Sequence, residues 1–410
     1  MLTNGLISLL AIAGLASNAL AGPVRKVSNA GTAGTIADKY IVVLKNGLSE
    51  SAVTKHTNRI SSFHSNVARD LTGARAHGVG RKFRFSATGF NGYSGGFDKT
   101  TLQEILNSPE VDYVEQDTVV TINAIQKGST WGLARISHAD YSPTGDYNYE
   151  YDEAAGKGTA VYVIDTGIRI THDEFKTSNG STRAFWGANF ASGGDSDGNG
   201  HGTHCAGTIA GNTYGVAKKA NVVAVKVLSA GGSGTTSGVI AGMNWVVTDT
   251  QERGWNSVAS MSLGGPKSAA LNAAVDSIFN AGITIVVAAG NENQNAANVS
   301  PASAPNAITV GAADSNNRKA SFSNYGAVVD VFAPGVSVLS SWATDDKATR
   351  SISGTSMACP HVAGLAAYYI STTGNSDPAA ITEKIVGSAV GQLISPPKDT
   401  TDKIAYNGYA

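Results

Sequence analysis

The sequence predicts an α/β protein, a doubly wound parallel sheet with helices on both faces, preceded by a smaller α+β domain. Two observations support this prediction. From about residue 159 onward, short apolar runs without polar alternation are separated by segments of helical periodicity, as parallel strands covered on both faces require. Before residue 124 the elements follow a different order, with a strand, two helices and a returning strand.

The predicted small domain begins with a strand at 39–44. Ser49 follows, and serine is a preferred helix N-cap. A second helix begins near Thr100 and must stop at Pro109, since proline cannot continue a helix. A strand at 111–115 then completes the α+β unit. The apolar residues of the first helix recur at helical spacing, at Val53, Ile60, Phe63 and Val67.

The predicted large domain alternates buried strands with amphipathic helices, which indicates βαβ units and hence a parallel sheet. One helical stripe spans 239–247. Another spans 271–279 and ends at Gly282, a residue type that favours helix C-termini. The predicted strands lie at 159–164, 222–228, 258–263, 283–289 and 307–312.

The bulk composition is that of a folded, sparsely charged protein. Of 410 residues, 42% are hydrophobic and 15% are charged, and the formal net charge is −1. A chain of this length and composition can bury a full-sized core. No run of five like charges occurs, so the sequence gives no sign of a nucleic-acid partner or of a polybasic membrane surface.

The N-terminus is typical of a secretory signal peptide. Residues 2–20 carry no charged side chain, 6–15 form an apolar stretch, and the sequence Ala19-Leu20-Ala21 is typical of a cleavage site. A membrane anchor is the alternative, but the stretch is too short to cross a bilayer. We therefore expect a secreted, extracellular protein that has no membrane association once the signal is removed.

Two segments carry residues suited to nucleophilic catalysis at the edge of such a sheet. In open α/β sheets, reactive groups gather at the carboxyl ends of the strands. Asp165 directly follows the strand at 159–164, although a lone aspartate at this place is more often a turn residue. Ser356 begins an apolar helix, where it is either a simple N-cap or a nucleophile whose oxyanion the helix N-terminus can stabilise.

His201 and His204 begin another helix, and several interpretations are open for them. Two histidines at i and i+3 can bind a metal, but no Glu or Cys follows at zincin spacing. Both can also be ordinary core or surface histidines. The order Asp, His, Ser along the chain argues against an α/β-hydrolase, in which the serine precedes the acid and the histidine.

The three segments together resemble a known family. They read DTG from Asp165, HGTHCAG from His201 and GTSMACPHVAG around Ser356, and they are similar to the signatures of the subtilisin-like serine proteases, peptidase family S8. Within this family, the chain most resembles the proteinase K branch and the subtilisins secreted by dermatophyte fungi. Cys359 departs from the pattern, since much of the family has threonine there.

The resemblance implies three parts of the chain. Residues 1–21 are the signal peptide, 22–123 resemble a ferredoxin-like I9 inhibitor propeptide, and 124–410 form the catalytic domain. The protein is then made as a zymogen. We expect it to cut its own chain between Asn123 and Ala124, with the tail before this bond lying in the substrate cleft.

Roles for individual residues follow from the same resemblance. Ser356 corresponds to the nucleophile, His201 to the general base and then acid, and Asp165 to the group that orients the histidine. Asn291 corresponds to the side-chain amide of the oxyanion hole, where it acts together with the backbone N–H of Ser356.

The resemblance also implies where substrate binds. An extended peptide would add a strand to two loop edges, and small residues would leave a P1 pocket for an apolar or aromatic side chain. Without the catalytic triad of Asp165, His201 and Ser356, the glycine-rich segments that form these edges would be interpreted as plain loops. The implied substrate-binding residues are Gly232, Ser233, Gly234, Ser262, Leu263, Gly264, Ala288, Ala289 and Gly290.

Other sites are implied with alternatives. Pro305, Ala307 and Asp330 match the calcium site of the proteinase K branch, with two backbone carbonyls and one carboxylate, although Asp330 can also simply cap a loop. Asn179 and Asn298 begin N-glycosylation sequons, the second followed by a proline that disfavours its use.

Cys205 and Cys359 can form one disulfide or remain two thiols, and the sequence leaves this open. The resemblance implies a monomeric endopeptidase without a catalytic cofactor. Its partners are protein and peptide substrates, keratin and other host structural proteins among them, and its own propeptide. A binding protein on an inactive protease scaffold would lack a triad member, and none is missing. A pure protease inhibitor would leave the larger domain without a role.

Overall fold

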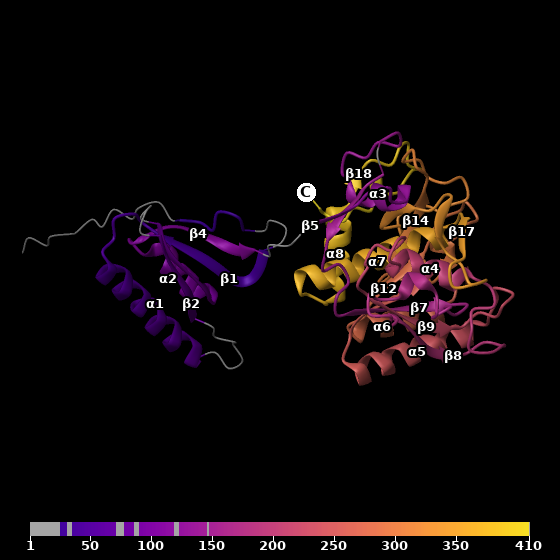
Figure 1. Cartoon of the computed structure of the whole chain (residues 1–410), viewed down its shortest axis with the longest axis horizontal. Helices are drawn as coiled ribbons and strands as arrows, with labels where there is room; N and C mark the ends of the chain where they lie inside the picture. Colours follow the sequence, from indigo (N-terminus) through magenta and orange to yellow (C-terminus); the bar gives the residue numbers. More distant parts are fainter. Residues whose placement is uncertain are drawn as a thin grey trace, which may run out of the picture. The chain divides into compact units, whose positions relative to one another are not determined.

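The computed structural model describes residues 25–30, 35–70, 78–85, 90–118, 123–145 and 147–409. The predicted signal peptide lies outside these residues. The chain divides into two compact units, Met1–Thr118 and Val119–Ala410 (Figure 1), and each is described by itself.

The N-terminal unit is a four-stranded antiparallel sheet with two helices packed against it through Ile60 and Ile105. Ser49 caps the first helix, since its Oγ accepts a hydrogen bond from Ala52 N at 3.2 Å, and the second helix ends just before Pro109 as predicted. In sheet order the strands are β2 Gly78–Phe85, β3 Phe90–Gly96, β1 Thr35–Leu44 and β4 Val111–Thr118, and the helices are α1 Glu50–Asp70 and α2 Lys99–Asn107.

The larger unit contains a nine-stranded sheet whose neighbouring strands are all parallel except the pair β18–β19. All five predicted strands are present, with ends that shift by at most two residues. In sheet order the strands are β18 Val390–Gly391, β19 Lys403–Ile404, β15 Val331–Pro334, β14 Ile308–Ala313, β12 Thr284–Ala288, β10 Asn256–Met261, β7 Thr159–Asp165, β9 Asn221–Lys226 and β8 Ala184–Asn189.

Helices cover both faces of this sheet, so the doubly wound prediction is confirmed. Along β7, Val161 and Val163 pack into the core beneath one helix layer, while Tyr162 and Ile164 pack into the core beneath the other. Residues of α4, α7 and α8 belong to the first of these cores and residues of α5 and α6 to the second, and Figure 1 labels all five helices. These helices are α4 His201–Ala210, α5 Thr236–Arg253, α6 Ala269–Asn280, α7 Thr355–Thr373 and α8 Pro378–Ser388.

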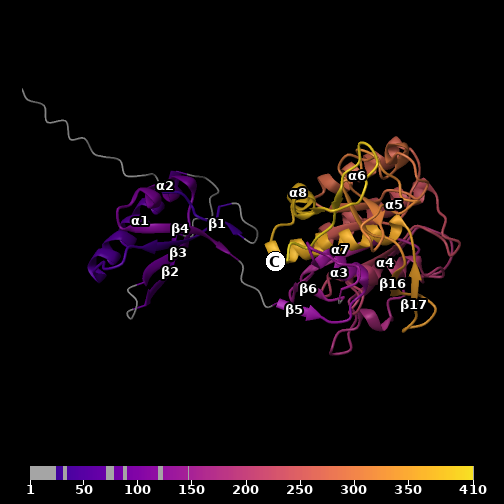
Figure 2. The same ribbon diagram turned by 90° about the horizontal axis from the view of Figure 1, so that it is seen from above.

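Smaller elements surround the sheet, and Figure 2 shows several of them beside α7. One antiparallel pair, β5 with β6, includes the predicted processing bond, because Asn123 is opposite Asp152 and Ala124 is opposite Tyr151. This bond is therefore held in a β-ladder. The remaining elements are α3 Trp131–Ser137, β5 Asn123–Gln126, β6 Tyr149–Asp152, β11 Gly265–Pro266, β13 Val299–Ser300, β16 Val338–Ser341, β17 Thr349–Ile352 and the 3₁₀ turns Asp173–Phe175 and Ala296–Asn298.

The topology fixes the place of the site. After β7 the chain forms β8 and β9 on one side of that strand and then β10 on the other, so the strand order reverses at the carboxyl end of β7. Ligands of doubly wound sheets bind at such a switch point. Within the part of the chain that the structure describes, no helix is both long and apolar enough to cross a membrane.

Candidate active site

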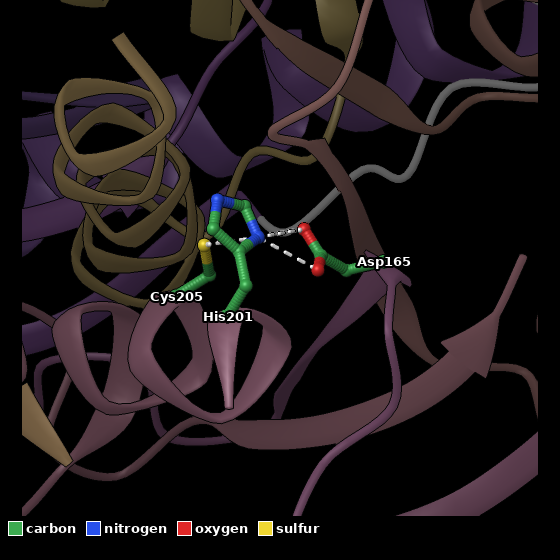
Figure 3. A group of neighbouring side chains, drawn as sticks. All are labelled: Asp165, His201 and Cys205. Atoms are coloured by element: carbon green, nitrogen blue, oxygen red, sulfur yellow. Dashed lines mark hydrogen bonds and ion pairs between the residues drawn. The ribbon is translucent and has the colours of Figure 1, made fainter. Parts of the chain in front are cut away.

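The switch point carries a buried carboxylate paired with a histidine. Asp165 is the last residue of β7 and is fully buried, and His201 is the first residue of α4. The Nδ1 atom of His201 lies 2.8 Å from Oδ1 and 3.0 Å from Oδ2 of Asp165 (Figure 3). An Nδ1–H that donates to the carboxylate leaves a lone pair on Nε2, which is the tautomer that a general base requires.

The carboxylate also sets the basicity of the ring. Burial by itself lowers the pKa of His201, but that pKa lies well above its usual value, and the negative charge of Asp165 is the largest of the causes that raise it. Cys205 adds no charge at neutral pH, because burial raises the pKa of its thiol. The ring is therefore a stronger base than a free histidine.

Asp197, which the sequence analysis did not single out, holds the histidine loop in place. Its buried carboxylate accepts hydrogen bonds from Gly200 N at 2.8 Å and from Thr203 N at 2.9 Å, in the first turn of the helix that His201 begins. It also accepts one from the Thr166 hydroxyl at 2.9 Å, which ties this turn to the end of β7. The Asp165–His201 distance is thereby fixed by a third group.

Ser356 lies in the first turn of α7, and a proline four residues later changes its surroundings. Pro360 has no N–H to donate to the Ser356 carbonyl, as the regular helical pattern would require. Two side chains donate instead, the Ser262 hydroxyl at 2.9 Å and the Cys205 thiol at 3.4 Å. The backbone of Ser356 is therefore anchored to the residue that follows β10 and to α4.

The hydroxyl of Ser356 donates to the Ser262 carbonyl at 3.1 Å, and His201 is not its hydrogen-bond partner in this structure. Both side chains nevertheless line the same cavity. Catalytic hydrogen bonds are often long or misaligned before substrate binds.

The alternatives of a metal site and of a disulfide do not fit these contacts. His204 is buried, its Nε2 donates to the carbonyls of Val338 and Arg350, and burial lowers its pKa to about 4, so it is a neutral structural residue. Cys205 and Cys359 are both buried free thiols. Asp165, His201 and Cys205 do cluster (Figure 3), but the cysteine proton is donated to Ser356 and a thiolate would be needed to bind a metal.

Asn291 lies beside the start of α7 with one end of its amide already bonded. Its Oδ1 accepts hydrogen bonds from Thr355 N at 2.8 Å and from the Thr355 hydroxyl at 3.0 Å. The Nδ2 donor is therefore on the opposite end of a fixed amide group. Ser356 follows Thr355 in the first helical turn, where backbone N–H groups have no intrahelical acceptor. Thr355 is a second functional residue that the sequence analysis did not single out.

Two adjoining cavities meet at Ser356. One, of about 500 Å³, lies between the segments that follow β10 and β12, and Ala288, Gly290, Asn291 and Glu292 are among its lining residues. The other, of about 560 Å³, contains His201 together with predicted binding residues. Ala289 is fully buried and lines neither cavity. The predicted residues in the second cavity are Gly232, Ser233, Gly234, Ser262, Leu263 and Gly264.

Two of the predicted calcium ligands, Pro305 and Ala307, directly precede β14, and the third, Asp330, is hydrogen-bonded to Thr309 of that strand. The Thr309 N–H donates to the Asp330 carboxylate at 2.7 Å, and the Thr309 carbonyl accepts a hydrogen bond from Asp330 N at 3.0 Å. No basic side chain forms an ion pair with Asp330 among the described residues, and burial raises its pKa to about 6. A partly buried carboxylate without a counter-charge suits a hard cation such as Ca²⁺.

The two sequon asparagines differ in their surroundings. Asn179 is exposed, and its Oδ1 accepts a hydrogen bond from Ser181 N at 3.2 Å in a surface turn. Asn298 is also exposed but lines the first cavity, and Ser300 of its sequon is fully buried. A glycan at Asn298 would therefore lie next to that cavity. Both sites remain predictions.

Comparison with known proteins agrees with this geometry. Residues 156–408 match the model of the subtilase family, and residues 39–123 match the model of the peptidase inhibitor I9 family. The chain is 78% identical to a cuticle-degrading serine protease of Arthrobotrys oligospora over the full length of both, and 46% identical to subtilisin-like protease 4 of Trichophyton equinum over 91% of this chain and 92% of that protein.

A solved structure extends the likeness to three dimensions. The crystal structure of a cold-adapted subtilisin-like serine proteinase matches with a TM-score of 0.62 and 44% identity, over 68% of this chain and 98% of that one. Dermatophyte relatives are among the matches, as the motifs predicted. The chain therefore belongs to the subtilase family of serine proteases and carries an I9 inhibitor domain before its protease domain.

Proposed function

We propose that the protein is a serine endopeptidase whose catalytic residues are Asp165, His201 and Ser356. The observation that carries this proposal is the buried Asp165–His201 pair beside a cavity that Ser356 also lines. The Ser356 hydroxyl passes its proton to Nε2 of His201 while Oγ attacks the peptide carbonyl. Asn291 Nδ2 and the Ser356 backbone N–H stabilise the resulting oxyanion.

The tetrahedral intermediate then collapses to an acyl-enzyme. The C–N bond breaks, the leaving amine takes the proton from His201, and the acyl group stays on Ser356. A water molecule then attacks the acyl carbon while it gives a proton to His201. The ester bond to Ser356 Oγ breaks, Oγ takes that proton back from His201, and the product leaves with a new carboxyl group. Asp165 stays ionised throughout and stabilises the imidazolium that forms twice in each cycle.

A broad specificity with an apolar or aromatic P1 residue fits the first cavity. Ala288 and Gly290 leave its volume of about 500 Å³ open, and Leu263 and Val299 supply apolar walls. Glu292 also lines it, so a basic P1 side chain has one carboxylate partner there. The loops at Gly232–Gly234 and Ser262–Gly264 provide edges for an extended substrate.

The assay that tests this function uses the purified mature enzyme and chromogenic peptides that differ at P1. We expect release of chromophore from peptides with Phe or Leu at P1, and complete loss after treatment with a phosphonylating reagent that reacts with an activated serine. Lack of turnover on the whole panel, with a folded protein, would favour the alternative of a binding protein on an inactive scaffold.

Secretion and self-processing complete the proposal. The N-terminal signal and the I9 match at residues 39–123 support a secreted zymogen with a propeptide at 22–123 and a mature enzyme from 124. Since Asn123 and Ala124 belong to the β5–β6 ladder, the bond between them must reach Ser356 before this ladder forms. The cuticle-degrading relative supports structural proteins of a host, cuticle proteins or keratin, as natural substrates.

We also propose a structural Ca²⁺ ion held by the Asp330 carboxylate and the carbonyls of Pro305 and Ala307. Because burial raises the pKa of Asp330 to about 6, the unfolded chain binds fewer protons here than the folded chain between about pH 4 and 6. Without calcium, the ionisation of Asp330 therefore lowers the free energy of unfolding as pH rises through that range. A bound cation would offset the cost.

Removal of calcium by a chelator is expected to lower Tm by roughly 5–10 °C relative to the Tm measured with calcium at about 100 times its Kd. The effect should be larger at pH 8 than at pH 5, since Asp330 is ionised at the higher pH. In Asp330→Asn the calcium dependence of Tm should disappear, whereas Asp314→Asn, at a turn where the carboxylate accepts backbone N–H bonds, should retain it. Equal calcium shifts in both variants, measured by calorimetry, would place the ion elsewhere.

A further inference from the structure

Asn324 is a fully buried asparagine whose whole amide is bonded to the segment that carries Asn291. Its Oδ1 accepts hydrogen bonds from Glu292 N at 3.1 Å and from Gln294 N at 2.9 Å. Its Nδ2 donates to the Ala289 carbonyl at 2.9 Å and to the Glu292 carboxylate at 2.8 Å. An amide side chain can donate two hydrogen bonds and accept two, so all four positions are used on one segment.

The main chain extends the same contact. Asn324 N donates to the Gly290 carbonyl at 3.0 Å, so bonds from one residue reach both sides of Asn291. Gly290 has a φ of +99°, and a Cβ at this position would collide with Nδ2 of Asn324. The segment 289–294 is therefore shaped around Asn324, and glycine at 290 is needed for both its conformation and its lack of a side chain.

Asn324 is in turn fixed to the central sheet. The Ser323 hydroxyl donates to the Asn324 carbonyl at 2.9 Å and accepts a bond from Ala312 N of β14 at 3.0 Å. The Lys319 ammonium donates to the Ser323 carbonyl at 2.9 Å and to the Asn293 side chain at 3.0 Å. A chain of hydrogen bonds thus runs from a core strand through Asn324 to the segment that lines the first cavity.

We infer that Asn324 is a positioning residue for oxyanion stabilisation, an inference that rests on the role proposed above for Asn291. Thr355 fixes only the Oδ1 end of the Asn291 side chain, while Asn324 fixes the backbone on both sides of it. A donor aimed at a developing charge is effective only if it is held in place before the reaction. Asn324 supplies that constraint without touching substrate.

The test uses Asn324→Asp, which keeps the shape and the Oδ1 acceptor but removes the Nδ2 donor and brings a carboxylate next to Glu292. Rates are expressed per active site titrated with a phosphonylating reagent, so that misfolded protein does not count. We expect kcat to fall about 10- to 100-fold with KM changed less than about 3-fold, because the loss lies in the transition state. A peptide boronate, which forms a tetrahedral anion on Ser356, should bind more weakly by a similar factor.

Asn407→Asp is the matched control, since Asn407 is equally buried, donates from Nδ2 to the Glu150 carbonyl at 2.8 Å and accepts from Tyr409 N at 3.0 Å. It should change kcat per titrated site less than about 2-fold, whatever it does to Tm. If both variants lower kcat alike, the effect of Asn324 is general destabilisation and the inference fails.

A double-mutant cycle separates this inference from the proposed function. Asn291→Ala alone should lower kcat by about 10²- to 10³-fold. In that background, Asn324→Asp should add less than about 3-fold, because the donor that it positions is already gone. Full additivity of the two losses would overturn the inference and leave the role of Asn291 intact. An unchanged kcat in Asn291→Ala would instead overturn the proposed oxyanion site.

Discussion

Replacing Ser356 by alanine is expected to lower kcat by about 10⁵- to 10⁶-fold, the order of loss that serine proteases show without their nucleophile. No other described hydroxyl lines both cavities and lies in the first turn of a helix beside Asn291. The fold should be unaffected, because the substitution removes one oxygen whose single side-chain bond is to the Ser262 carbonyl. The carbonyl of Ser356 keeps its bonds from Ser262 and Cys205.

The same variant tests whether the chain processes itself. Refolded in the absence of any other protease, Ser356→Ala should remain full length, while the unmodified chain acquires a new N-terminus at or near Ala124. Ser353→Ala, a change at an exposed serine three residues earlier, should be processed normally. Turnover within tenfold of the unmodified enzyme would contradict the assignment of Ser356, and trimming of the variant would contradict self-cleavage.

Strands buried on both faces could be predicted because their sequence has a distinct pattern. β7, β9, β10, β12 and β14 are apolar runs without alternation, and each was found within two residues of its predicted bounds. β2 and β3 were not predicted, because Gly78, Gly80, Gly92, Gly95 and Gly96 interrupt any strand pattern there. β15 was missed because only four residues, ending in Pro334, pair with β14.

The residues of the candidate site also fall into those that the sequence marks and those that it does not. Asp165, His201 and Ser356 are recognisable because each stands in a local motif, and the structure brings the first two into contact and all three to one switch point. Thr355 and Asn324 act through partners far along the chain, so no local pattern marks them. Asp197 bonds to the nearby Gly200 N and Thr203 N, but its link to the end of β7 runs through Thr166, 31 residues earlier. One local feature does mark the surroundings of Ser356: Pro360 inside an apolar helix leaves the carbonyl four residues earlier without its donor.

Replacing Asp165 by asparagine is expected to lower kcat by about 10⁴-fold, because the neutral amide neither stabilises the imidazolium nor fixes the tautomer that leaves Nε2 free. The buried aspartate makes 2.8 Å and 3.0 Å contacts with Nδ1 of His201, and an amide of the same shape can offer the ring a donor instead of an acceptor. The folded structure should tolerate the change, since the Thr166 N–H can still bond to the remaining oxygen.

The pH dependence of kcat/KM provides the second measurement for this variant. His201 acts as a base only when neutral, so activity rises as pH passes upward through its pKa. Asp165 raises that pKa well above its usual value of about 6.5, which places the acid limb of the unmodified enzyme at higher pH than a free histidine would give. In Asp165→Asn the charge is absent and burial prevails, so the acid limb of the residual activity should move to lower pH.

Asp195→Asn, a change at an exposed carboxylate near the same loop, should leave the acid limb in place. A limb that stays unmoved in Asp165→Asn would show that Asp165 does not set the basicity of the catalytic histidine.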